Sequence, residues 1–429
     1  MKRKPLSILL MLVMLLSILS MPANAAADLT LPSLAVIYKD HFLIGGCFGA
    51  DKIAGDRGRL FFHHYNAMTA ENAMKPESLY NRDREFDFSA IDALLAQMPD
   101  YSLHGHTLVW HQQSPAWLIQ NEDGSPLTRA RAAQNMANHI GAVAGHFAGK
   151  VYSWDVINEA IVDSITDPSN WKAALRQTGW FRAFANGVPG ENGHGYVDFA
   201  FRQARAADPN AVLYYNDYGL NNPRKARAVA AMVKEINDAW LAEGNTRLLI
   251  EGIGMQGHYN LGTRATDVEA SIKLFANLGV KLSITELDIS AKPGGPSEML
   301  RQAIKYAELF VVFKAHSHVI ERVSFWGLDD ATSWLNMPEF GGPGADPLLF
   351  RADMGAKPAF HAVASPEAFL REHRLPIDGG DIFSGSDTSA WLNAGLYSPN
   401  KFVRCAYTLL YWLLWPGARA VHWVKGLFG

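Results

Sequence analysis

The stretch "VYSWDVINE", residues 151–159, decides how the rest of the chain is interpreted. Its first seven positions are mostly apolar, which predicts a buried strand. It ends in a carboxamide and a carboxylate side by side, Asn158 and Glu159. A strand that ends in polar residues has either reached solvent or presents a functional group. The neighbouring strands decide between these two interpretations.

Seven other apolar runs predict strands of similar length, and several of them are separated by helical patterns. One helix is predicted to begin after the N-cap Asn222, with Pro223 at its first position and Gly244 at its end. Two more are predicted to run from Asp267 to Gly279 and from Ser297 onward. The predicted strands span residues 43–49, 67–72, 102–110, 211–217, 249–258, 281–289 and 322–328.

Eight strands that alternate with helices predict an α/β protein with a closed (β/α)8 TIM barrel. A doubly wound open sheet is the alternative. Such a sheet usually carries a glycine-rich phosphate loop after its first strand, and "GGCFGADKIAG", residues 45–55, matches that fingerprint poorly. The closed barrel is therefore the favoured prediction.

Polar side chains end six successive predicted strands. In a parallel barrel these ends meet on one face, which holds the active site. One such residue is usually only a strand end, but six strands in succession indicate a site. The residues are Glu71, Asn72, His106, Trp110, Asn158, Glu159, Asn216, Asp217, Gln256, His258, Glu286 and Asp288.

Two of the carboxylates, Glu159 and Glu286, come from the fourth and seventh strands, on opposite sides of the predicted barrel mouth. Two opposed carboxylates are the minimum equipment for glycoside hydrolysis: one protonates the leaving oxygen and the other attacks or activates water. Asn158 is placed to hydrogen-bond a sugar 2-hydroxyl. His258, oriented by Asp288, would keep Glu286 ionised. A salt bridge or a solvated rim is the alternative for either glutamate alone.

A metal site is the competing interpretation of the histidines. His104 and His106 share one strand face, His111 follows, and His63 and His64 lie upstream. No helical His-Glu-x-x-His pattern and no nearby cysteine accompany them, so we expect neither a metal nor a cofactor. His106 is predicted to bind a sugar, and His104 and His111 to pack.

Seven motifs together resemble, in order, those of glycoside hydrolase family 10, the endo-β-1,4-xylanases. The resemblance covers residues 43 to 364 and implies a (β/α)8 barrel that cleaves internal bonds of xylan with retention, through a covalent glycosyl-enzyme. The motifs are "NAMTAENAMKPE", "HGHTLVWHQQSPAW", "WDVINEA", "YYNDY", "GIGMQGHY", "ITELDI" and "SFWGLDDATSWL".

The resemblance also implies roles for single residues. Glu159 matches the general acid/base and Glu286 the nucleophile. His258 and Asp288 match the pair that sets the ionisation of the nucleophile, and Asn158 matches the 2-hydroxyl contact. The implied sugar-binding residues are Glu71, Asn72, Lys75, His106, Trp110 and Gln113 on the glycone side, Trp326 and Trp334 as an aromatic wall, and Asn216 and Gln256 with less defined roles.

One carboxyl must be protonated while the other is ionised, so their surroundings must differ. We expect His258, Lys75 and Gln256 to favour the ionised form of Glu286. Residues 163–196 form a longer segment than the family pattern; it borders the aglycone subsites or is a solvated surface loop. The rival functions are another retaining β-1,4-glucanase or aryl-glycosidase, and a non-catalytic polysaccharide-binding barrel.

Composition agrees with a globular protein. Among the 429 residues, 48% are hydrophobic and 19% charged, and the net charge of −3, with no basic stripe, excludes a typical nucleic-acid binder. The 12 Trp and 14 Tyr are many, and such aromatic side chains either bind sugars or bury a large area. The two cysteines, Cys47 and Cys405, are expected to be unpaired thiols, with a disulfide left open. We expect a monomer.

The two ends lie outside the barrel pattern, which we assign to residues 26–364. Residues 1–25, "MKRKPLSILLMLVMLLSILSMPANA", predict a secretory signal peptide and therefore an exported protein, secreted or periplasmic; a membrane anchor is the alternative. Residues 365–429 predict a linker and an apolar tail of unassigned role. Its run 405–415 is too short to span a bilayer, and contact with a membrane surface, another protein or the barrel stays open.

Overall fold

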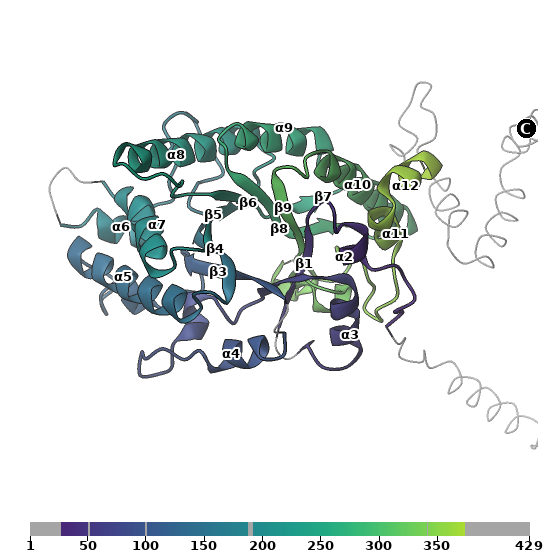
Figure 1. The fold of residues 1–429 in the computed structure, drawn as a ribbon, viewed down its shortest axis with the longest axis horizontal. Helices are drawn as coiled ribbons and strands as arrows, with labels where there is room; N and C mark the ends of the chain where they lie inside the picture. Colours follow the sequence, from purple (N-terminus) through teal and green to yellow (C-terminus); the bar gives the residue numbers. More distant parts are fainter. Residues whose placement is uncertain (1–26, 50–51, 99–100, 188–191, 341, 374–429) are drawn as a thin grey trace, which may run out of the picture.

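The computed structural model describes residues 27–373 except 50–51, 99–100, 188–191 and 341 (Figure 1). The signal peptide, Cys405 and the tail beyond residue 373 lie outside the described residues.

Within this part of the chain, eight parallel strands close into a barrel. The hydrogen-bonded order runs β6-β5-β4-β3-β2-β1-β9-β8, and a further pairing of β6 with β8 closes the ring. The short β7 adds to β8 outside that ring. The strands are β1 (Leu43–Phe48), β2 (Ala67–Ala70), β3 (Ser102–Val109), β4 (Val151–Asn158), β5 (Val212–Asp217), β6 (Gly252–Met255), β7 (His258–Asn260), β8 (Lys281–Ser290) and β9 (Ile320–Phe325).

Helices cover the outside of the barrel, and Figure 1 shows α5 to α10 following one another around the strands. Their inner faces are apolar and bury against the strands, which is the layer arrangement of a (β/α)8 barrel. The helices are α2 (Leu34–Ile37), α3 (Gly55–His64), α4 (Ser89–Leu95), α5 (Arg129–His146), α6 (Gly179–Phe184), α7 (Gly195–Ala207), α8 (Pro223–Ala242), α9 (Ala265–Ala276), α10 (Pro296–Ala315), α11 (Pro358–Ala364) and α12 (Pro366–His373).

The predicted fold is confirmed, and each predicted strand is present. The sixth is divided: β6 and β7 are separated at Gly257, which has φ +84°. Helix α8 begins as predicted, with the Asn222 side chain accepting from the Arg224 N–H at 2.9 Å. Helix α9 begins at Ala265, two residues before the predicted start at Asp267.

The two described ends of the chain meet on the barrel wall. The Tyr38 hydroxyl, just after α2, donates to the carbonyl of Val363 in α11 at 2.6 Å. Helix α12 lies beyond the boundary predicted at residue 364, and it packs on α10, with Lys314 paired to Glu367. The described chain therefore continues as ordered helix for a further turn or two after the family pattern fades.

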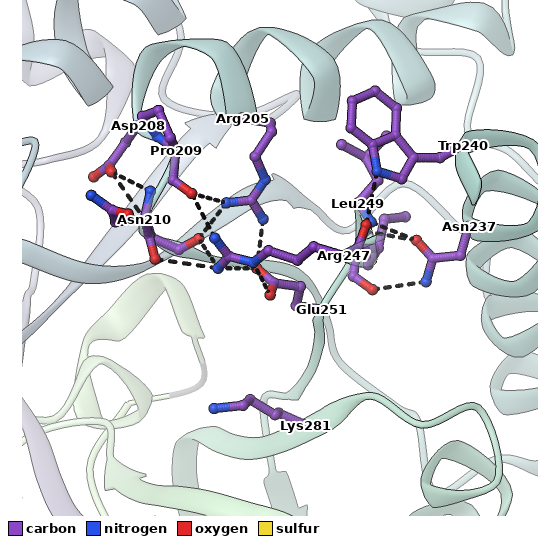
Figure 2. A network of polar contacts seen from close by, with 12 residues as sticks. Arg205, Asp208, Pro209, Asn210, Asn237, Trp240, Arg247, Leu249, Glu251 and Lys281 are labelled. Carbon is purple, nitrogen blue, oxygen red and sulfur yellow. Dashed lines mark hydrogen bonds and ion pairs between the residues drawn. The ribbon is translucent and has the colours of Figure 1, made fainter. Parts of the chain in front are cut away.

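A polar cluster ties the loops together at the end of the barrel where β5 and β6 begin (Figure 2). Arg205 and Arg247 both pair with Glu251 and both donate to backbone carbonyls of residues 209–211. Beside them, Asn237 of α8 accepts from the N–H groups of Leu249 and Ile250 and donates to the Ile250 carbonyl. This cluster lies at the opposite end of the strands from the predicted site.

The structure also bears on the expectations about the cysteines, a metal ion and a membrane span. Cys47 is a buried free thiol. The described residues contain no cluster of His, Cys, Asp and Glu that could hold a metal ion. In the same part of the chain, no helix has both the length and the apolar character needed to cross a membrane.

Candidate active site

The carboxyl ends of the strands bring the predicted residues to one face of the barrel. Glu159 follows β4 directly, Glu286 lies within β8, and His258 begins β7. The side chains of Glu159 and Glu286 are buried, with 9% and 5% of each residue exposed. Ionisable groups buried this far need specific partners, and those partners define what each carboxylate does.

Glu159 has two side-chain donors. Trp110 Nε1 donates to Oε2 at 3.0 Å, and Gln256 Nε2 donates to Oε1 at 2.9 Å. Its backbone has φ +57°, a left-handed conformation that few non-glycine residues adopt. Strained backbone of this kind clusters at functional sites, where the surrounding structure holds it.

Glu286 is bound by an imidazole and an amide. His258 Nε2 lies 3.2 Å from Oε2, and Asn216 Nδ2 donates to Oε1 at 2.8 Å. Burial raises the pKa of Glu286, but the His258 hydrogen bond and the charges of His106 and His258 outweigh it, so the pKa is lowered overall. Glu286 is therefore ionised at neutral pH, as a nucleophile must be.

His258 is held by two carboxylates. Its Nδ1 lies 2.9 Å from Asp288 Oδ2, on the other side of the ring from Glu286. Burial alone lowers the pKa of His258, but Asp288 and Glu286 together raise it to about 10. Trp334 Nε1 donates to the same Asp288 oxygen at 2.9 Å, which fixes the carboxylate behind the imidazole.

A chain of amides connects the two glutamates. Asn158 Oδ1 accepts from Asn216 Nδ2 at 3.0 Å and from Gln256 Nε2 at 3.2 Å. Since these same two amides donate to Glu286 and Glu159, the orientation of all three is set by the carboxylates at the ends. The amide chain therefore fixes the two carboxylates relative to each other.

A glycine in β6 makes room for this chain. A Cβ added to Gly254 would lie 2.3 Å from Asn216 Oδ1 and 3.0 Å from the Thr285 methyl. Thr285 in turn donates to Asn216 Oδ1 at 2.6 Å. The motif "GIGM" thus leaves space for the amide that holds Glu286.

The glycone-side residues of the β2 and β3 ends form a second group. Lys75 Nζ donates to Asn72 Oδ1 at 2.9 Å and to Gln113 Oε1 at 2.7 Å, and it lies 5.3 Å from the Trp110 ring centroid. Glu71 pairs with Lys52. Burial lowers the pKa of Lys75, although the nearby carboxylates oppose that effect. Gln113 has φ +41°, a second strained position at this face.

His106 is held by a buried carboxylate of β4, that of Asp155. Its Nδ1 lies 2.8 Å from Asp155 Oδ2, and His104 Nε2 lies 2.9 Å from the same oxygen. His104 Nδ1 also contacts Ser153 Oγ at 2.7 Å, and burial, followed by the charge of Arg322, lowers the pKa of His104 to about 4. His104 therefore packs as a neutral ring, and His106 faces the site.

Trp326 and Trp334, which are predicted to form an aromatic wall, pack against the two histidines of the site. Trp326 lies edge-on to His106 with ring centroids 5.4 Å apart, and Trp334 packs on His258 at 5.1 Å. Both indoles are partly exposed, as a sugar-binding surface requires.

The sequence prediction for Gln256 is wrong in one respect. Gln256 was expected to favour ionised Glu286, yet its side-chain amide donates to Glu159, and Asn216 holds Glu286 instead. Sequence reasoning missed Asp155, Tyr215 and Arg176. A buried carboxylate in the middle of an apolar strand, Asp155, was a signal that could have been used.

The long segment after β4 reaches the acid/base. Thr178, Trp180 and Tyr196 line a small pocket together with Trp110 and Glu159. Part of this segment is therefore packed against Glu159 and is not a fully solvated loop. That the segment borders the aglycone subsites stays a prediction.

Comparison with known proteins places this site in a family. The model of glycosyl hydrolase family 10 matches residues 33–366. The chain belongs to that family. The resemblance in the seven motifs is thus confirmed.

Individual relatives are about one-third identical to the chain over the regions that align. It is 36% identical over 350 residues to an endo-1,4-beta-xylanase of Geobacillus stearothermophilus, covering 78% of this chain and 99% of that protein. It is 37% identical to endo-1,4-beta-xylanase A of Thermotoga neapolitana over 79% of this chain, but spans only 31% of that protein's length. A family 10 xylanase structure from termite gut, which contains a bacterial Ig-like domain, superposes with a TM-score of 0.70 at 35% identity, covering 81% of this chain and 80% of that one.

Proposed function

We propose that the protein is an endo-β-1,4-xylanase that retains the anomeric configuration. The observation that carries the proposal is the pair Glu159 and Glu286, buried at one barrel face with different partners. Glu286 is bound by protonated His258 and by the Asn216 amide, and Glu159 by two neutral donors. These surroundings suit an ionised nucleophile and a proton-transferring acid/base.

In the first step, Glu159 protonates the glycosidic oxygen while Glu286 attacks the anomeric carbon. The bond to the aglycone breaks, and an ester forms between the glycone and Glu286. In the second step, the Glu159 carboxylate removes a proton from water, the water oxygen attacks the anomeric carbon, and Glu286 is released. No metal or cofactor is required by either step.

Sugar binding is assigned to the groups around the pair. Asn72, Lys75 and Gln113 form a connected polar group for glycone hydroxyls, and His106 adds a donor from β3. Trp326 and Trp334 provide the apolar wall. Xylan is proposed as the substrate because the relatives above carry that activity in their names.

The test compares reducing-sugar release from xylan and from carboxymethyl cellulose, with Glu159→Ala and Glu286→Ala as variants. We expect strong release from xylan that falls by at least about 10³-fold in Glu286→Ala. Release from cellulose alone would keep the mechanism and replace the substrate. A chain that binds xylan without cleaving it would support the rival, a polysaccharide-binding barrel.

We also propose that the chain is exported, on the basis of the charged, apolar and Ala-x-Ala regions of residues 1–25. N-terminal sequencing of the protein expressed in a bacterial host, after separation of medium, periplasm and cytoplasm, tests this. A mature N-terminus at Ala26 outside the cytoplasm is expected. An intact N-terminus in the cytoplasm would contradict it.

A further inference from the structure

The backbone that carries Glu159 is held in an unfavourable conformation by its neighbours. With φ +57°, a glutamate costs about 1 kcal/mol or more relative to extended or helical backbone. The chain around it must therefore supply contacts that fix this turn. Those contacts come mainly from strand β5 and from Arg176.

Tyr215 of β5 holds the two residues that follow Glu159. Its hydroxyl oxygen accepts from the N–H groups of Ala160 and Ile161, each at 3.1 Å. The same hydroxyl donates to Asp217 Oδ2 at 2.5 Å. A tyrosine hydroxyl has one proton and two lone pairs, so every hydrogen bond it can make is used.

Asp217 sets the direction of that hydroxyl. It is fully buried, and its other oxygen pairs with Lys225 Nζ at 2.9 Å. Because the Tyr215 O–H donates to the Asp217 carboxylate, the lone pairs of Tyr215 must face Ala160 and Ile161. Lys225, which also pairs with Asp163 at 3.0 Å, keeps the carboxylate in place.

Glu159 itself is held on both sides of its α-carbon. Its N–H donates to the Asn216 carbonyl at 2.9 Å, and its carbonyl accepts from Arg176 Nε at 3.0 Å. Arg176 is in turn fixed by Asp163 and Tyr218. The Ala160 carbonyl accepts from the Arg176 backbone N–H at 2.7 Å, so five successive backbone groups, from the Glu159 N–H to the Ile161 N–H, are hydrogen-bonded.

We propose that Tyr215, with Asp217 and Arg176, positions the carboxyl of Glu159 for proton transfer to the leaving group. They are positioning residues that act through the backbone and do not touch the substrate. Strand β5 then aligns both carboxylates, since its Asn216 side chain holds Glu286 while Tyr215 holds the turn at Glu159. This inference rests on the proposed glycosidase function.

The experiment measures kcat/KM of Tyr215→Phe on two aryl β-xylobiosides. Phenol is a poor leaving group and needs protonation, whereas 2,4-dinitrophenol leaves without it. For the phenyl substrate we expect a loss of about 10- to 100-fold, the effect of an acid displaced by a fraction of an ångström. For the dinitrophenyl substrate we expect a change within about threefold, since glycosylation then needs no acid.

Tyr214→Phe is the matched control. Tyr214 lies in the same strand and is equally buried, and its hydroxyl bonds Ser283 and Glu321, away from Glu159. Its loss should lower stability without changing the ratio of the two rates. Arg176→Gln, at a partly exposed position, removes the donor to the Glu159 carbonyl and should change that ratio in the same direction as Tyr215→Phe even if Tyr215→Phe folds poorly.

An equal loss with both leaving groups in Tyr215→Phe and Arg176→Gln would overturn the inference, because a general structural defect does not distinguish leaving groups. So would an unchanged rate with both substrates. Wild-type protein that cleaves neither xylobioside would instead contradict the proposed function. The phenyl and dinitrophenyl groups are not sugars, so a lost aglycone contact does not explain a positive result.

Discussion

The imidazole of His258 contacts two carboxylates at once, those of Glu286 and Asp288, and its positive charge favours the ionised form of Glu286. Burial opposes its positive charge, but the charges of Asp288 and Glu286 outweigh burial and raise the pKa to about 10. The cation then lowers the pKa of Glu286. Glu286 is therefore ionised because of the charge of His258 and not because of exposure to solvent.

Replacing His258 by Gln should move the acid limb of the kcat/KM profile to higher pH. The amide of Gln still donates a hydrogen bond but carries no charge, so the pKa of Glu286 rises. The profile on an aryl β-xylobioside measures this. His146→Gln, on α5 beside Asp92, is the control and should leave the limb in place. An unmoved limb in His258→Gln would show that the charge of His258 does not govern Glu286.

At this scale, strand periodicity and strand ends are sufficient to find Glu159, Glu286, His258 and Asp288. They are insufficient to predict the hydrogen-bond partner of each of these side chains. Strand periodicity led to the assignment of Gln256 to Glu286, but its amide donates to Glu159. The strand breaks at the next residue, Gly257, where periodicity no longer predicts which side chains meet.

At the level of helices and strands, some side chains form hydrogen bonds with backbone N–H and C=O groups that have no partner in a neighbouring strand. Asn237 of α8 satisfies three backbone groups of Leu249 and Ile250 just before β6, in a site 5% exposed (Figure 2). The residues there form no regular ladder, so the amide takes the place of a neighbouring strand.

Asn237→Ala should lower the free energy of unfolding by about 2–4 kcal/mol, because it leaves buried N–H and C=O groups without partners. The kcat on xylan should stay unchanged at temperatures where the variant is folded, since Asn237 lies at the far end of the barrel from Glu159. Urea unfolding measures the loss. Asn245→Ala, which removes only one bond to the Trp240 carbonyl, should cost less than about 1 kcal/mol. Equal losses in the two variants would contradict this account of α8.

Helix boundaries illustrate what local sequence leaves open. Asp267 was predicted to start α9, yet the helix begins at Ala265 and Asp267 lies in its first turn. An acidic residue suits both places, since it caps an N-terminus or interacts favourably with the helix dipole there. Asn222 before α8 was unambiguous because Pro223 fixes the first helical position.

For the molecule as a whole, the predicted barrel follows from the alternation of strands and helices. Closure needed the pairing of β6 with β8, which joins strands that are separated by β7 and α9 in the sequence. The sequence prediction supplied the number of strands, and the parallel order follows because each connection carries a helix on the outside.

The contribution of His258 to the stability of the folded protein should decline as pH rises above 6.5. The pKa of His258 is raised from 6.5 to about 10 on folding, so its contribution is fully present below pH 6.5 and is lost as pH rises through about 10. The unfolding free energy of wild type minus that of His258→Gln, measured between pH 6 and 9, should therefore fall with pH. A difference that is flat or rises over this range would contradict the assigned protonation state.

In the proposed mechanism, Glu286 forms a covalent bond to the sugar while Glu159 first donates and then removes a proton. The most direct test is mass spectrometry of protein incubated with 2,4-dinitrophenyl 2-deoxy-2-fluoro-β-xylobioside, followed by peptide mapping. We expect an added fluoro-xylobiosyl group on the peptide that contains Glu286, and none after Glu286→Ala. An adduct on another carboxylate, or turnover of xylan by a protein that never forms an adduct, would contradict it.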